Sequence, residues 1–91
     1  MGEDDLTTRR KRLRYRSARR GTRELDLFLG SFAERHLESL SPGELDRYEA
    51  ILEANENEIY DWLAGRTPVP PEHDNDVMAL LLNFRFVPTS S

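Results

Sequence analysis

The sequence predicts an all-α protein, a single small bundle of about five helices. Apolar residues recur at steps of three and four positions from Leu25 to Phe84, which is the spacing of amphipathic helices. No stretch of the sequence alternates strictly between polar and apolar residues, as half-buried strands do. The 91 residues are enough for one domain with one modest core.

We expect the helical domain to occupy residues 9–86, after a disordered segment at 1–8 and before a flexible tail at 87–91. A basic helix comes first, and an amphipathic helix follows it. Ser41 then begins a further helix, because serine is a good N-cap, Pro42 suits the first helical position, and Glu44 can reach back to the cap. The amphipathic helix has one apolar face: Leu25, Phe28, Leu29, Phe32, His36 and Leu40.

Two shorter helices are predicted in the second half of the chain. Asn55 caps the first, which ends near Gly65. The prolines between Thr67 and Pro71 predict an extended connector, and residues 74–76 supply the cap and first-turn charge of the last helix. The apolar stripe of that helix is Val77, Leu80, Leu81 and Phe84. Six aromatic residues are expected to contribute most to the core: Phe28, Phe32, Tyr48, Tyr60, Trp62 and Phe84.

The charge is distributed unevenly along the chain. Up to Arg23 there are nine basic and three acidic residues, a net charge of +6, and from Glu24 onward four basic and fourteen acidic residues, a net charge of -10. Such an asymmetry indicates a basic arm for an anionic or acidic partner. The same arm could dock on the acidic body of its own chain.

Several classes of protein are excluded or disfavoured by the sequence. There is no cysteine, and His36 and His73 do not have the spacing of a zinc-binding helix. The glycines match no phosphate-binding loop, and no serine lies in a nucleophile elbow. No apolar run approaches the roughly 20 residues of a membrane span. The acidic opening of the chain predicts neither a signal peptide nor a transit peptide. We therefore expect no catalytic site and no metal site.

The boundary between the basic and acidic parts lies at Arg20-Gly21-Thr22-Arg23-Glu24. Gly21 interrupts the helical pattern where the basic helix meets the amphipathic helix. Glycine permits a sharp turn or the close approach of another backbone. Glu24 falls in the first turn of the next helix, where its charge suits the helix dipole. The structural interpretation is a corner between two helices. The functional interpretation is a bare backbone patch that faces a partner.

These five residues form an R-G-x-x-E motif, which Leu25 and Asp26 follow. A basic helix with Tyr15 precedes the motif. Later in the chain comes the acidic stretch 56–63, which contains Tyr60 and Trp62. In order, spacing and length these features resemble the succinate dehydrogenase assembly factor family, the small flavinylation factors of bacteria and mitochondria. The resemblance covers residues 9–86.

The resemblance implies an assembly factor that is not itself an enzyme. Such a factor would bind the flavoprotein subunit of succinate dehydrogenase, with fumarate reductase as a second candidate, and promote covalent attachment of FAD to it. The client would hold the FAD, so no cofactor would be bound stably by the factor. Three motif residues and three residues of the basic helix are implied to bind the partner: Arg20, Gly21, Glu24, Tyr15, Arg16 and Arg19.

Two alternatives stay open. An antitoxin-like or nucleic-acid-binding regulator would use the same arginines, although the acidic remainder of the chain argues against nucleic acid as a partner. A free FAD carrier is the other alternative. We expect a monomer without membrane association, located in the cytoplasm of a bacterium or in the mitochondrial matrix of a eukaryote.

Overall fold

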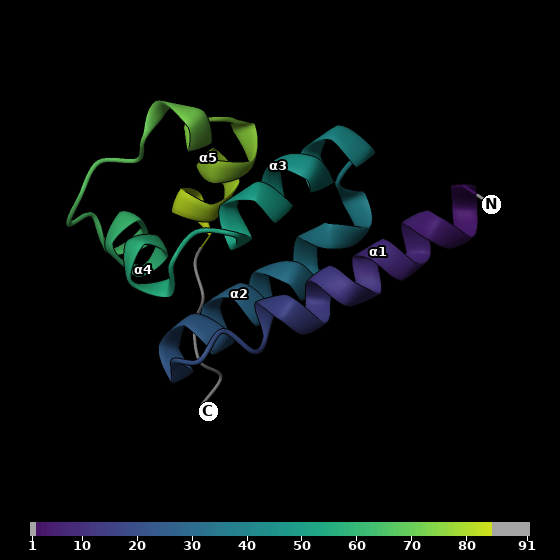
Figure 1. Cartoon of the computed structure of the whole chain (residues 1–91), viewed down its shortest axis with the longest axis horizontal. Coiled ribbons are helices and arrows are strands. Elements are labelled where there is room, and N and C mark those ends of the chain that lie inside the picture. Colours follow the sequence, from purple (N-terminus) through teal and green to yellow (C-terminus); the bar gives the residue numbers. More distant parts are fainter. Residues whose placement is uncertain (1, 85–91) are drawn as a thin grey trace.

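The computed structural model describes residues 2–84. This part of the chain contains five α-helices and two single-turn 3-10 helices. The first two helices lie side by side and run in opposite directions, and the third packs against the first (Figure 1). The predicted all-α bundle is therefore confirmed. In chain order the elements are α1 (Gly2–Ser17), α2 (Arg23–His36), η1 (Leu37–Ser39), α3 (Pro42–Leu52), α4 (Glu56–Ala64), η2 (Pro71–His73) and α5 (Asp76–Asn83).

Helix α1 starts earlier than predicted. It begins at Gly2, so residues 2–8, which were expected to be disordered, are helical. Leu6 explains the difference, because its side chain is half-buried against the core and so ties this part of the helix to the bundle. Residue 1 and the predicted tail at 87–91 lie outside the described residues.

The predicted helix caps of the middle of the chain are confirmed. The Ser41 hydroxyl accepts the Glu44 N–H at 3.2 Å, and the Glu44 carboxylate accepts the Ser41 N–H at 2.9 Å. Asn55 caps α4 by accepting the N–H of Asn57 at 2.8 Å. Gly65 ends α4 in the left-handed region with φ 77°, a conformation that glycine adopts without a steric penalty.

The connector between α4 and α5 is extended only as far as Pro70. Pro71, which the sequence placed in the extended connector, starts the turn η2. Proline suits this first position, because the N–H that it lacks would have no partner there. Asn75 then caps α5 as predicted, and its side chain accepts the N–H of Met78 at 3.0 Å.

Most of the predicted aromatic residues lie in or against the core. Phe32 and Tyr48 are fully buried and Trp62 is 8% exposed, which confirms Trp62 as a core residue. Phe28 and Phe84 are half-buried and meet edge to face, with 5.3 Å between their ring centroids. The core therefore extends from α1 and α2 to the end of α5.

Two predicted core positions are wrong. Tyr60 is 38% exposed, because α4 buries Ile59 and Trp62 and the next position along a helix points about 100° away. Leu80 is 36% exposed, and Met78 is buried in its place. The buried face of α5, which packs against α3, is thus rotated toward Met78.

A buried hydrogen-bond chain fixes α1 to α3. The Ser17 hydroxyl donates to the Leu13 carbonyl at 2.7 Å and lies 2.5 Å from the Tyr48 hydroxyl. Since the Ser17 proton is already used, Tyr48 is the donor to Ser17. All three residues are fully buried, and burial raises the pKa of Tyr48 to about 12.

Candidate partner-binding site

The corner between α1 and α2 has a defined backbone shape. Gly21 has φ 111°, which side-chain-bearing residues rarely adopt. The Asp26 carboxylate accepts the backbone N–H groups of both Arg20 and Gly21, the second at 3.1 Å. Sequence reasoning missed the role of Asp26, although a carboxylate one turn inside a helix is well placed to bind the N–H groups of the preceding loop. Asp26 therefore fastens the motif loop to α2.

Gly21 itself faces outward. The residue is exposed, and a Cβ added to it would meet no atom of the chain within 4 Å. The packing of the fold would therefore tolerate a side chain at this position, and only the positive φ favours glycine. The same open space would allow another protein to approach the backbone closely at this position.

Arg20 points inward, which the sequence did not reveal. Its side chain is 10% exposed, and its Nη2 donates to the carbonyl of Leu52 at 2.6 Å. The same nitrogen lies 3.6 Å from the Glu56 carboxylate, and Nε is buried without a hydrogen-bond partner. Arg20 therefore holds the corner against the carbonyl end of α3, where a cation is also favoured by the helix dipole.

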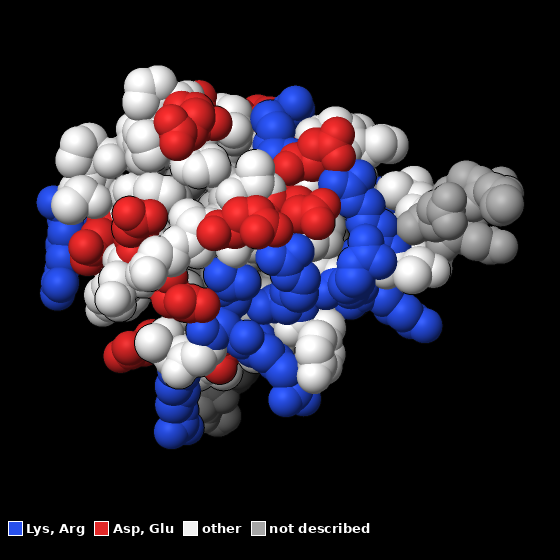
Figure 2. Space-filling model, in the orientation of Figure 1, with Lys and Arg blue, Asp and Glu red and all other residues white. Residues whose placement is uncertain are grey.

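Arg16 is likewise engaged within the chain. Its guanidinium lies 3.5 Å from the Glu49 carboxylate and 3.1 Å from that of Glu53. Arg9 pairs with Glu49 at 2.9 Å and with Asp46. Figure 2 shows the result, a group of basic side chains directly beside a band of acidic ones. Part of the basic arm thus docks on the acidic body of its own chain.

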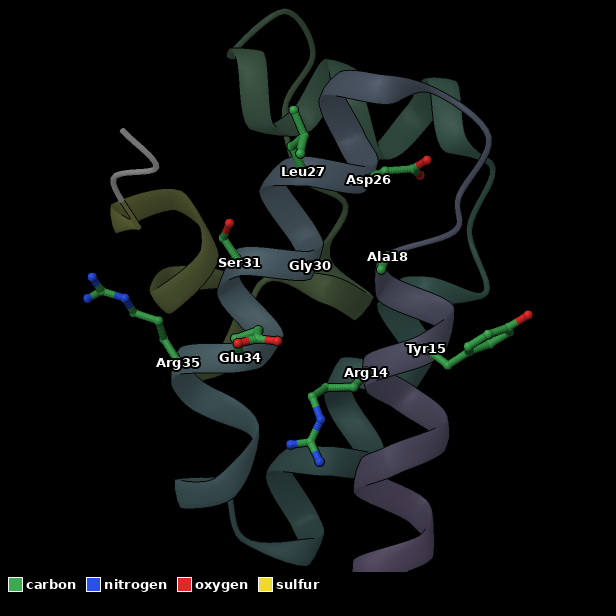
Figure 3. Close-up of a pocket in the computed structure, with 9 residues that line it drawn as sticks. All are labelled: Arg14, Tyr15, Ala18, Asp26, Leu27, Gly30, Ser31, Glu34 and Arg35. Atoms are coloured by element: carbon green, nitrogen blue, oxygen red, sulfur yellow. The ribbon is translucent and has the colours of Figure 1, made fainter. Parts of the chain in front are cut away.

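Tyr15 and Arg19 lie on the outer side of α1. Tyr15 is 62% exposed, and the Arg19 guanidinium stacks over its ring at 4.8 Å from the centroid. In Figure 3 the Tyr15 ring points away from α2. Lys11 and Arg12 are exposed as well. This face offers an aromatic ring and cations to a partner, with attraction over the ring worth about 0.5–1 kcal/mol at such sites.

A mixed groove of about 730 Å³ lies between α1 and α2 (Figure 3). Its floor is formed by small residues, where the helices approach closely: a Cβ on Gly30 would lie 3.4 Å from that of Ala18. Arg14 points into the groove and Arg35 points away from it. The lining contains both signs of charge, so the groove indicates no single class of ligand.

Glu24 is exposed on the first turn of α2 and has no ion pair with any residue that the structure describes. It also lines a second groove, of about 440 Å³, between α2 and α4. The walls of this second groove are apolar and include Leu27 and Tyr60, both partly exposed. Sequence reasoning missed this groove, because it assigned Tyr60 to the core.

Both histidines pack against aromatic rings. His36 is half-buried and stacks on Phe32, with 4.6 Å between ring centroids. His73 packs on Trp62 at 5.3 Å. Among the described residues no group of three or more potential ligands could hold a metal ion. Within the same part of the chain, no helix is long and apolar enough to cross a membrane.

A helical bundle that presents an exposed glycine corner beside an exposed aromatic ring and a carboxylate unpaired among the described residues has the features of a protein-binding module. Comparison with known proteins agrees with this class. Residues 11–85 match the family described as flavinator of succinate dehydrogenase. The chain belongs to this family, which confirms the resemblance drawn from the motif.

Two relatives illustrate the family. The chain is 43% identical over 72 residues to the FAD assembly factor SdhE of Acetobacter pasteurianus. The aligned region covers 79% of this chain and 66% of that protein. It is 38% identical over 81 residues to the mitochondrial succinate dehydrogenase assembly factor 2-A of Drosophila mojavensis, covering 87% of this chain and 52% of that protein. The chain thus spans half to two thirds of the length of these curated relatives.

Proposed function

We propose that this protein is an assembly factor that promotes covalent attachment of FAD to the flavoprotein subunit of succinate dehydrogenase, with the flavoprotein of fumarate reductase as a second client. The observation that carries the proposal is the match of residues 11–85 to the flavinator of succinate dehydrogenase family. The names of the relatives, one a FAD assembly factor and one a succinate dehydrogenase assembly factor, support it.

The geometry of the corner is consistent with a docking role. Asp26 and Arg20 hold the loop from inside the chain, while Gly21 and Glu24 face outward. A loop that is already ordered loses little conformational entropy on binding, which favours affinity. The exposed Gly21 would then let the backbone of the client come close, and Tyr15 and Arg19 would add contacts from α1.

The reacting groups belong to the client in this proposal, so the factor needs no catalytic side chain. It would contribute by holding the client in a conformation that aligns the flavin with its attachment residue. Such positioning can lower a barrier by about 7–11 kcal/mol in the most favourable intramolecular cases. We also propose that the factor binds no FAD stably by itself and acts on FAD that the client holds. It would bind the client as a monomer and work in the bacterial cytoplasm or the mitochondrial matrix.

The test is production of the flavoprotein with and without this protein, followed by a denaturing gel scored for flavin fluorescence. We expect a covalently fluorescent band that depends on the factor. Equal fluorescence without the factor would contradict the proposed function. Titration of the isolated factor with FAD should show no saturable binding.

The role of the corner is tested by Gly21→Arg, with Gly43→Arg as the matched control. Gly43 is exposed in the first turn of α3, and an added Cβ would meet only the Arg47 guanidinium at an ordinary 3.8 Å. Gly21→Arg should abolish client binding and covalent flavin, while Gly43→Arg should retain both. Thermal unfolding of the two variants measures the loss of stability that the positive φ at position 21 causes, independently of client binding. Normal binding by a folded Gly21→Arg protein would show that the corner is not the docking site.

A further inference from the structure

The apolar groove between α2 and α4 is an exposed hydrophobic concavity on this small protein. Leu27 on one wall is 48% exposed and Tyr60 on the other is 38% exposed. Phe28 and Leu63 are half-buried deeper in the same groove. Single exposed apolar residues are ordinary, but apolar residues gathered around a concave surface of about 440 Å³ form the kind of lining that binding sites have.

The groove is continuous with the motif corner through Glu24. This residue is the last of the R-G-x-x-E motif and also a member of the groove wall. A partner that covers Gly21 and Glu24 would therefore reach the entrance of the groove without a break in the contact surface.

The charge around the groove is one-sided. Glu24 has no ion pair with any described residue, whereas Arg66, whose guanidinium lies 5.6 Å from the centre of the Tyr60 ring, already pairs with Asp61 at 3.8 Å. The charge still available to a partner at the wall is therefore negative. An occupant that brings a cation to Glu24 would be favoured, and one that brings a carboxylate there would be disfavoured.

We propose that the groove receives an apolar side chain from a segment of the client flavoprotein, and that a lysine or arginine beside that apolar residue pairs with Glu24. This inference rests on the proposed function, which supplies the client, and adds a second anchor to the corner contact. The apolar residue of the client is buried in the groove and contributes most of the binding energy. The ion pair between Glu24 and the cation of the client fixes the position of that segment along the groove.

The first test compares Leu27→Asp with Leu82→Asp. The two leucines are equally exposed, at 48% and 47%, but Leu82 on α5 does not line the groove. Affinity for the purified flavoprotein should fall by about tenfold or more in Leu27→Asp, the size of effect expected for an interface anchor, and stay unchanged in Leu82→Asp. Equal affinities of the two variants would overturn the proposal, and circular dichroism would show that both are folded.

The second test identifies the occupant. A photoreactive phenylalanine analogue at position 27 should crosslink to a flavoprotein peptide that has an apolar residue next to a lysine or arginine, and the same analogue at position 82 should not. A crosslinked peptide without such a pair would overturn the assignment. Saturable FAD binding by the isolated wild-type protein that Leu27→Asp removes would instead make the groove a flavin site and refute a protein occupant.

These outcomes separate the inference from the proposed function. A wild-type factor that neither binds the flavoprotein nor increases covalent flavin refutes the proposed function itself. A wild-type factor that does both, with Leu27→Asp as active as Leu82→Asp, leaves that function standing and refutes only the groove. Glu24→Gln should weaken binding less than Leu27→Asp and reduce its dependence on salt.

Discussion

Replacement of Arg20 by alanine distinguishes a residue that holds the corner from one that touches the partner. The side chain is 10% exposed, donates to the Leu52 carbonyl at 2.6 Å and lies 3.6 Å from the Glu56 carboxylate. Each of these groups belongs to the protein itself. We therefore expect Arg20→Ala to lower the free energy of unfolding first, and to weaken client binding as a consequence of a looser corner.

The size of the effect follows from the contacts. The charged hydrogen bond to Leu52 contributes about 1.5–3 kcal/mol, and burial of the largely covered stem adds about 1.6 kcal/mol, at about 0.8 kcal/mol for each buried methylene. The unpartnered Nε works in the opposite direction, since its removal recovers about 1–3 kcal/mol of desolvation cost. The pair with the half-exposed Glu56 adds little. At the middle of these ranges the net loss is about 2 kcal/mol. Each kcal/mol lowers the melting temperature by about 4–8 °C in a domain of this size.

The assay is thermal and urea unfolding followed by circular dichroism, with client affinity measured below the melting transition. Arg19→Ala is the matched control, because the neighbouring arginine is exposed and stacks only over Tyr15. It should change stability by less than about 0.5 kcal/mol. An Arg20→Ala protein with unchanged stability and lost client binding would refute the argument and make the guanidinium a direct contact.

Two further predictions concern the core. Trp62→Ala should lower the free energy of unfolding by about 3–5 kcal/mol, because the indole is 8% exposed, and a loss below about 1 kcal/mol in urea unfolding would contradict its core position. Burial raises the pKa of Tyr48 from the ordinary 10.0 to about 12, so the native state favours the neutral phenol. The stability that the neutral phenol contributes is complete below pH 10 and is lost as the pH rises from 10 to 12. Tyr48→Phe should reduce that alkaline loss of stability, by about 2–3 kcal/mol at most, and an unchanged pH profile would contradict the assignment.

Local features of the fold were predictable from the sequence because they depend on residues close together in the chain. The Ser41 capping box joins residues three positions apart, and Gly65 ends α4 through its own backbone conformation. Helix periodicity likewise placed Phe32 and Tyr48 in the core. The exact rotation of the buried face of a helix depends on where the helix contacts its neighbour. The sequence does not contain that information, so the predicted burial of Leu80 and Tyr60 is wrong.

The candidate site was predictable in position and only partly in geometry. The motif located the corner, and glycine indicated its unusual backbone. The direction of the Arg20 side chain depends on Leu52, which is 32 positions away, and the ion pair between Arg16 and Glu53 spans 37 positions. No local pattern contains such pairings. The sequence therefore showed that the arm could dock on its own body without showing which arginines do so.

The order of the motif follows from the geometry of the corner. Thr22 is the N-cap of α2, so Gly21 stands one residue outside the helix and Glu24 stands in its first turn. Glu24 is favoured there by the helix dipole whether or not a partner is present. Arg20, one residue before Gly21, is directed to the carbonyl end of α3 and fixes the loop. A residue inserted between Gly21 and Thr22 would move Arg20 and Gly21 away from the Asp26 carboxylate, so it should lower both the free energy of unfolding, measured by urea unfolding, and the affinity for the client.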